Sequence, residues 1–205
     1  MKLYYFQGSC ALAPHIVLEW VGADYELSEV KRSDTRSPEF LKKNPAGKVP
    51  VLEVEGHGYV HQVNAVLQYL ADAFPDAGLG EDGSEDKRRA MQRWLSHFNG
   101  DVHTSFTPYF LTRRFADSDE AKGEVRAHAA TEVAFQLKII DDHMDSRDWM
   151  LGEDRSILDP YLFVFTLWAD FMPDRLDNLP NLKAFSMRMR DDAGVHSALV
   201  GEGLL

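Results

Sequence analysis

Apolar residues follow two different spacings along the chain. Up to residue 75, short apolar runs rich in aromatic and β-branched residues alternate with stretches of helical period. The predicted strands cover residues 2–6, 25–30, 49–54 and 59–60, and the predicted helices cover residues 12–22, 38–42 and 64–74. This order of strands and helices is typical of an α/β domain, a small sheet with helices packed on it.

From residue 86 onward only the helical period remains. An apolar stripe at spacings of three and four residues runs from Met91 to Phe110. Further helices are predicted at residues 118–144, 161–172, 179–191 and 194–199. Residues 161–172 are apolar on nearly every side, which predicts the buried central helix. Ser156 and Asp159 have the spacing of a capping box ahead of that helix.

A break without apolar period separates the two parts. Residues 75–86 hold a proline, three glycines and several acidic residues. Such a composition is typical of a boundary between domains. We therefore expect an α/β domain over residues 1–77 and an all-α domain over residues 86–205.

Composition excludes several classes of function. The chain has 205 residues and a formal net charge of −11, which argues against nucleic acid or an anionic membrane as a partner. Its single cysteine, Cys10, excludes an intrachain disulfide framework and a cysteine-based zinc site, and fits a reducing compartment. No signal-peptide pattern opens the sequence, and the longest apolar run, residues 161–172, is too short to span a bilayer. We expect a cytoplasmic protein.

Cys10 lies in the short turn between the first predicted strand and the first predicted helix. Free backbone N–H groups and the positive end of the helix dipole favour an anion at such a position. A thiol there can have a pKa below its usual value of about 8.5. The alternative is a buried, inert cysteine. The position at the helix start favours the reactive thiol.

Two further sequence features are suited to binding a small acidic peptide. Pro50 stands at the head of a predicted strand, and a cis Val49–Pro50 bond would turn the Val49 backbone outward to pair with an extended peptide. Gln62 and Val63 stand where the next helix begins, so backbone N–H groups there could hold a carboxylate. A thiol, an open backbone edge and an anion site together describe a pocket for a small acidic thiol peptide.

Short motifs occur in order along the whole chain. In the first part they are residues 1–5 (MKLYY), 8–15 (GSCALAPH), 44–50 (NPAGKVP) and 68–72 (QYLAD). In the second part they are residues 94–95, 102–103, 152, 159–163, 195–199 and 202–204. With these motifs the chain resembles bacterial beta-class glutathione S-transferases.

The resemblance implies a thioredoxin-like N-terminal domain, an all-α C-terminal domain that forms the electrophile pocket, a homodimer, and glutathione bound between the domains as co-substrate. It implies catalytic roles for Cys10, beside the glutathione sulfur, and for His103. Val49 would pair with the cysteinyl backbone of glutathione, and Gln62 with Val63 would hold the γ-glutamyl carboxylate. Further positions at the implied glutathione site are Tyr5, Ala11 and Pro50, with Tyr5 more structural than catalytic.

The helical period places His103 on a polar face. Ser96, Asn99, Gly100, His103 and Thr107 share one side of the predicted helix. This face is either exposed to solvent or lines a cleft, and two of its residues favour the cleft. Gly100 costs about 1 kcal/mol inside a helix, and the histidine can titrate near neutral pH.

Several side chains have open interpretations. Asp101, on another face, could reach the amino group of glutathione across a dimer interface. Aromatic residues of the second part are candidates for the electrophile pocket and equally for the core: Phe106, Tyr109, Phe110, Trp168 and Phe171. His15 and His97 are interpreted as packing residues, and the acidic pairs at residues 141–142 and 191–192 as solvated helix ends. No histidine has trustworthy metal-ligand spacing, so we expect no metal.

Departures from the family pattern bear on the mechanism. Ala11 replaces a frequent serine, Gln62-Val63 replaces a frequent Glu-Ser or Glu-Gly pair, and Thr104 replaces a frequent basic residue. Arg32 and Arg36 are unassigned candidates for the basic residue that contacts the glycyl carboxylate of glutathione. Fewer charged contacts predict weaker glutathione binding.

Three functions stay open from the sequence. The first is transfer of glutathione to small hydrophobic electrophiles, and the second is monothiol glutathione–disulfide exchange through Cys10. The alternative is a non-catalytic binding or interaction protein with the same fold. The leading prediction is a glutathione transferase.

Overall fold

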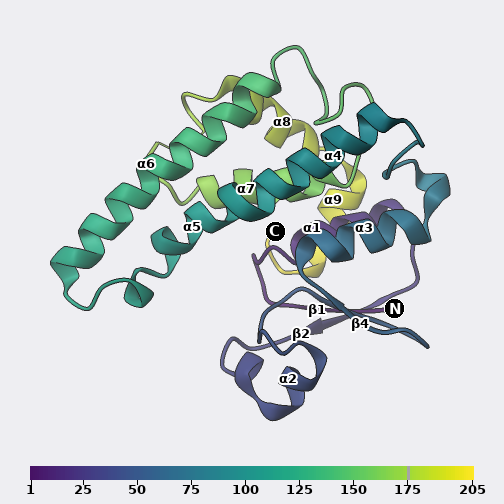
Figure 1. The fold of residues 1–205 in the computed structure, drawn as a ribbon, viewed down its shortest axis with the longest axis horizontal. Helices are drawn as coiled ribbons and strands as arrows, with labels where there is room; N and C mark the ends of the chain where they lie inside the picture. The colour runs from purple at the N-terminus through teal and green to yellow at the C-terminus, as the bar shows by residue number, and fades with distance from the viewer. Residues whose placement is uncertain (175) are drawn as a thin grey trace.

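A computed structural model describes residues 1–174 and 176–205. The first part forms a four-stranded sheet in the order β2-β1-β3-β4 (Figure 1). Its strands are β1 (Lys2–Tyr5), β2 (Glu26–Glu29), β3 (Val51–Val54) and β4 (Gly58–His61). β1 pairs parallel with β2 and antiparallel with β3, so Leu3 stands between Leu27 and Leu52. The predicted strands are confirmed, each within two residues at its ends.

Helices cover both faces of this sheet. α1 (Leu12–Trp20) and α3 (Val63–Ala73) lie on the face toward the helical part, and the short α2 (Pro38–Lys43) lies on the opposite face (Figure 1). α2 begins where the Ser37 side chain accepts a hydrogen bond from the Phe40 N–H and Pro38 follows, a favourable start for a helix. The predicted α/β architecture is confirmed.

The second part is helical throughout its regular elements. They are α4 (Glu85–His97), a π-helical turn (Phe98–Val102), α5 (His103–Phe110), α6 (Asp119–His143), α7 (Leu158–Ala169), α8 (Pro180–Arg190) and α9 (Ala193–Gly201). α7 is buried along most of its length, as its apolar sequence predicts. No helix among residues 1–174 and 176–205 combines the length and the apolar character needed to cross a membrane.

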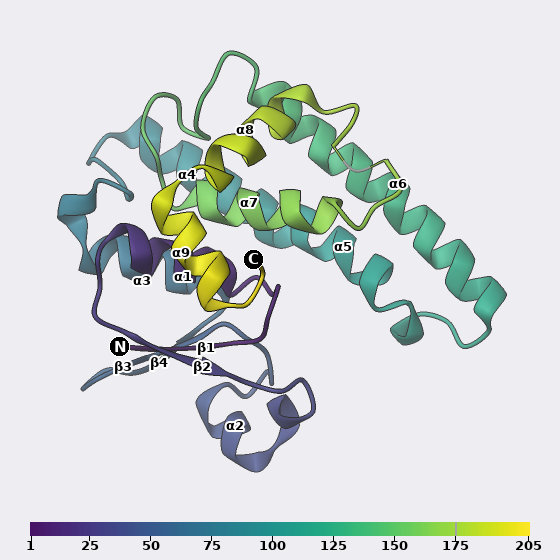
Figure 2. The ribbon, with the colours of Figure 1, turned by 180° about the vertical axis from the view of Figure 1, so that it is seen from behind.

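α1 joins the two parts. It contacts α3, which lies beside it on the same face of the sheet, and also α7 and α9 of the helical part (Figure 2). Its side chains Leu12, Ile16 and Leu18 are buried in a single apolar cluster that continues into the helical part. A smaller cluster around Tyr4, Phe40 and Val51 lies between the sheet and α2. The predicted limits of the two domains stay a prediction.

Two of the four acidic residues interpreted as solvated helix ends are structural, which corrects that interpretation. Asp141 is buried and accepts a hydrogen bond from the Leu182 N–H at 2.9 Å, at the start of α8. Asp192 caps α9 and also accepts from the Trp20 indole N–H at 2.7 Å. Asp142 and Asp191 are exposed, as expected.

Candidate active site

Cys10 lies in the turn between β1 and α1, directly before the helix begins. Gly8 gives this turn its left-handed backbone, with φ of +69°. The Cys10 side chain is only 9% exposed, and its Sγ donates to the Val49 carbonyl at 3.7 Å. The structure thus brings together the predicted thiol and the predicted backbone edge.

Burial decides the charge state of the Cys10 thiol. Loss of solvent raises its pKa to about 12, against smaller effects of its own backbone N–H and of Lys48 that lower it. The expected low pKa is therefore wrong for this structure. The helix does begin directly after Cys10, but α1 contacts helices of both parts of the chain, so desolvation outweighs the helix dipole.

A pH titration of thiol alkylation checks this state. With a pKa near 12, roughly one thiol in ten thousand is ionised at pH 8. The rate of reaction of Cys10 with iodoacetamide is expected to rise about tenfold per pH unit from pH 7 to 10 without a plateau. Free cysteine, the control, reaches half of its maximal rate near pH 8.5 and levels off about one pH unit higher. A plateau for Cys10 below pH 9 would contradict the burial argument.

The backbone edge has the geometry predicted for it. The Val49–Pro50 bond is cis. Asn44 holds the loop ahead of it, because its side-chain amide donates to the Lys48 carbonyl at 2.6 Å and its Oδ1 accepts from the Ala46 N–H. Gly47 is required there, since a Cβ would lie 2.7 Å from the Thr35 carbonyl oxygen. The Val49 carbonyl faces the Cys10 thiol, so in this state it is not free.

Gln62 precedes α3 with a strained backbone. Its φ of +75° and ψ of 123° fall outside the region that non-glycine residues ordinarily adopt. Such strain clusters at ligand-binding positions, where the surrounding fold maintains it. Val63 is the first residue of α3, so its N–H belongs to the helix start and has no partner within the helix.

His103 is the first residue of α5, directly after the π-helical turn. Its Nδ1 lies 2.8 Å from the Tyr161 hydroxyl of α7. Burial lowers the pKa of His103 to about 4, with a smaller contribution from Lys48. Titration near neutral pH was therefore a wrong expectation. Tyr161 lies in a motif that carries the family resemblance, yet no spacing links residues 103 and 161.

The polar face around His103 is mostly exposed. Ser96, Asn99 and Gly100 all lie at the surface, and no side-chain hydrogen bond within residues 1–174 and 176–205 joins them to Cys10. Their place at the glutathione site stays a prediction. Gly100 falls in the π-helical turn, a feature that often marks functional sites and that the sequence did not predict.

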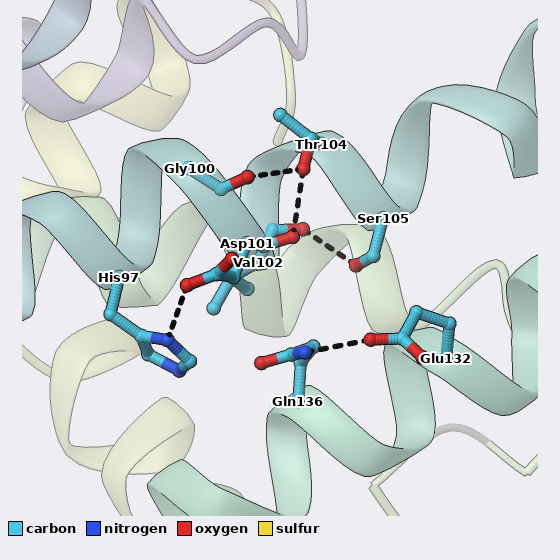
Figure 3. Close-up of polar contacts among 8 residues, drawn as sticks. All are labelled: His97, Gly100, Asp101, Val102, Thr104, Ser105, Glu132 and Gln136. Atoms are coloured by element: carbon cyan, nitrogen blue, oxygen red, sulfur yellow. Dashed lines mark hydrogen bonds and ion pairs between the residues drawn. The ribbon is translucent and has the colours of Figure 1, made fainter.

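Asp101 pairs within its own helix. Its carboxylate accepts from His97 Nδ1 at 3.1 Å, while the Thr104 hydroxyl donates to the Gly100 and Asp101 carbonyls (Figure 3). His97, interpreted as a packing residue, therefore has a polar partner on one side of its ring. The role of Asp101 across a dimer interface stays a prediction.

Residues distant in sequence hold the cysteine turn. The Trp168 indole N–H donates to the Gly8 carbonyl at 3.0 Å, and the Gln7 amide donates to the Gly203 carbonyl at 2.6 Å. His15 is satisfied on both ring nitrogens, by Glu202 at 3.2 Å and by the Tyr25 hydroxyl at 2.9 Å, which confirms its packing role. Tyr5 is buried beside His15, as a structural residue would be.

The aromatic candidates divide between core and surface. Phe106 is fully buried against Phe165 and Trp168, so it belongs to the core. Phe110 is exposed, and Phe171 is 71% exposed. Among the described residues, no group of three or more histidine, cysteine, aspartate or glutamate side chains is arranged to hold a metal ion.

Comparison with known proteins identifies the class. Residues 1–72 match the glutathione S-transferase N-terminal domain family. The chain is 38% identical over 204 residues to glutathione S-transferase GST-4.5 of Xanthomonas campestris pv. campestris, with both chains covered in full. The chain therefore belongs to the glutathione S-transferase family.

Solved structures agree with this assignment. The bacterial beta-class glutathione S-transferase of Sphingomonas chungbukensis is 33% identical over the full length of both chains, with a TM-score of 0.88. A sphingomonad glutathione S-transferase solved in complex with glutathione is 34% identical, also over both full chains, with a TM-score of 0.86. The predicted family, fold class and enzyme class are confirmed.

Proposed function

We propose that this protein binds glutathione between the sheet and the helical part and transfers it to small hydrophobic electrophiles. The observation that carries this proposal is the Val49 backbone ahead of β3, whose carbonyl accepts from the Cys10 thiol at 3.7 Å. An extended peptide paired with that edge would place its own thiol near Cys10. The glutathione complex of the sphingomonad relative supports the same ligand.

Backbone groups supply most of the proposed contacts. Val49 would pair with the cysteinyl backbone, the Val63 N–H would hold the γ-glutamyl carboxylate, and Gln62 would bond the α-amino group. The sheet side of the proposed site also includes Tyr5, Cys10, Ala11 and Pro50. The helical side includes Ser96, Asn99, Gly100, Asp101 and His103. Few of these side chains are charged, which supports the prediction of weaker glutathione binding than in a typical family member.

Lys48 is the proposed cation for the glycyl carboxylate, in place of Arg32 or Arg36. Its ammonium lowers the pKa of both Cys10 and His103, so its charge acts on the space between them. Arg32, in contrast, stacks on the Phe6 ring at 4.3 Å. Lys48 follows Gly47 in the loop that Asn44 holds, next to the backbone edge.

Conjugation is the reaction that the buried Cys10 favours. In conjugation the glutathione thiol loses its proton to solvent, its sulfur forms a bond to the electrophilic carbon, and the leaving group departs with its electron pair. Monothiol exchange would require the Cys10 thiolate as the attacking group. The raised pKa of Cys10 makes that thiolate rare. Phe110, exposed beside Trp168, and Phe171, exposed beside Phe110, would contact the electrophile.

Calorimetric titration with glutathione tests the proposal. Binding is expected at submillimolar to millimolar concentration, and Lys48→Gln is expected to weaken it about fivefold through loss of a charge-assisted hydrogen bond. Lys42→Gln, the same charge change at an exposed position of α2, is the control and should bind as the wild type does. Absence of binding at millimolar glutathione would favour the non-catalytic alternative.

We also propose that the protein forms a homodimer and that it is cytoplasmic. Phe135 and Ile139 are exposed one turn apart on α6, and a second copy of the chain would cover them. The single cysteine fits a reducing compartment, and the net charge of −11 argues against nucleic acid and membrane partners. Sedimentation velocity at micromolar concentration distinguishes dimer from monomer.

A further inference from the structure

The Tyr161 hydroxyl is buried with a single partner. Tyr161 is 0% exposed in α7, and its hydroxyl lies 2.8 Å from His103 Nδ1. Within residues 1–174 and 176–205 no second hydrogen-bond partner lies within reach of that hydroxyl. A buried hydroxyl proton without an acceptor is costly, so this proton has to point at His103.

The direction of this hydrogen bond determines where the His103 ring carries its proton. When the Tyr161 hydroxyl donates, Nδ1 must be the unprotonated, accepting nitrogen. The proton of the neutral ring then resides on Nε2, on the other side of the ring. The opposite arrangement, with a proton on Nδ1, would leave the hydroxyl proton of Tyr161 buried without an acceptor.

Packing fixes the orientation of the ring. The His103 ring packs against three aromatic rings, those of Tyr161, Phe165 and Trp168. Its centroid lies 5.0 Å from that of the Trp168 ring. Trp168 is itself tied to the cysteine turn through the Gly8 carbonyl. The ring of His103 is therefore held relative to the turn that carries Cys10.

We propose that Tyr161 is a positioning residue that keeps His103 as the neutral Nε2–H tautomer, so that His103 serves the glutathione sulfur as a hydrogen-bond donor and not as a base. This inference rests on the proposed function. The donated bond favours the thiolate over the thiol. The thiol proton passes to water, because Nδ1 is occupied by Tyr161 and Nε2 already holds a proton.

The charged and titratable groups facing His103 agree with a neutral ring. They are Lys48 in the loop ahead of β3, whose charge acts on His103, and Tyr161 in α7, whose hydroxyl contacts the ring. Cys10, in the turn before α1, acts on Tyr161. Lys48 disfavours a second positive charge, and the buried thiol and phenol are uncharged at neutral pH because burial raises the pKa of each. None of them provides an anion that would stabilise an imidazolium.

Long-range ¹H–¹⁵N correlation NMR on the ligand-free wild type tests the tautomer without any variant. His103 is expected to show an unprotonated Nδ1 and a protonated Nε2 at every pH from 5.5 to 8. In Tyr161→Phe the pattern should shift to a mixture of both tautomers. The matched control is Tyr25→Phe, which removes the hydroxyl that contacts His15 and should leave the His103 signals unchanged. A protonated Nδ1 in the wild type would overturn the proposal.

The reaction provides an independent readout. Tyr161→Phe is expected to lower kcat for conjugation of an activated chloronitrobenzene at pH 7 about tenfold, with the KM for glutathione within twofold of wild type. The thiol of bound glutathione, followed by the ultraviolet absorbance of its thiolate, should ionise at higher pH in the variant. An unchanged thiol titration would overturn the proposal. Failure of the wild type to bind glutathione would overturn the proposed function instead, and the NMR pattern would still decide the tautomer.

Discussion

Val63→Pro is expected to raise the KM for glutathione about 10- to 100-fold. The substitution removes one N–H group at the start of α3, which we propose holds the γ-glutamyl carboxylate, and a hydrogen bond to a charged group contributes about 1.5–3 kcal/mol. Proline is tolerated at the first residue of a helix, because that N–H makes no bond within the helix. The extended ψ of Gln62 also suits a following proline.

Val63→Ala is the control for this experiment. It removes most of the same buried side chain but keeps the N–H, so it should lose stability without losing comparable affinity. Initial rates at varied glutathione concentration provide the KM, and circular dichroism checks that the overall helix content is unchanged. Equal KM values for the two variants would place the carboxylate elsewhere.

Asp159→Ala is expected to lower the free energy of unfolding by about 3–5 kcal/mol. Asp159 is 0% exposed and accepts from the Met150 N–H at 2.8 Å and the Ser156 N–H at 2.7 Å. The Ser156 hydroxyl donates to the same carboxylate at 3.0 Å. Alanine would leave these buried donors without acceptors at the start of the central helix. A loss of this size approaches the whole stability of many domains.

Urea unfolding followed by tryptophan fluorescence measures the effect. Asp154→Ala is the matched control, because it removes an exposed acid from the same loop, and its effect should stay within about 0.5 kcal/mol. Should both variants unfold at the same urea concentration, the carboxylate of Asp159 would not be the organising contact of this loop.

Local patterns were sufficient to predict most of the fold. The strand at residues 2–6, the helix capped by Ser118 and the apolar α7 each depend on spacing within one segment, which the sequence displays directly. The cis Val49–Pro50 bond matches the geometry considered for that position, but a proline at a strand head does not by itself require the cis isomer. The π-helical turn was missed, since a single extra residue per turn barely alters the apolar stripe.

The candidate site was harder to predict because its chemistry depends on packing. The position of Cys10 at a helix start was evident, but its raised pKa arises from the helices that bury α1. The pairing of His103 with Tyr161 joins residues 58 positions apart on different helices. No local spacing encodes such a contact, and so the expected charge states of both catalytic candidates were wrong.

The hydrogen bond from Gln7 to the Gly203 carbonyl has a consequence for biosynthesis. Its two partners are 196 residues apart, and a ribosome adding about 5–20 residues per second needs roughly 10–40 s to make that stretch. Until α7 and α9 have been synthesised, the turn before α1 lacks its partners Trp168 and Gly203, and α1 lacks Glu202, the partner of His15. The turn that carries Cys10 therefore reaches its final set of contacts only after α9 has been synthesised and has docked against α1.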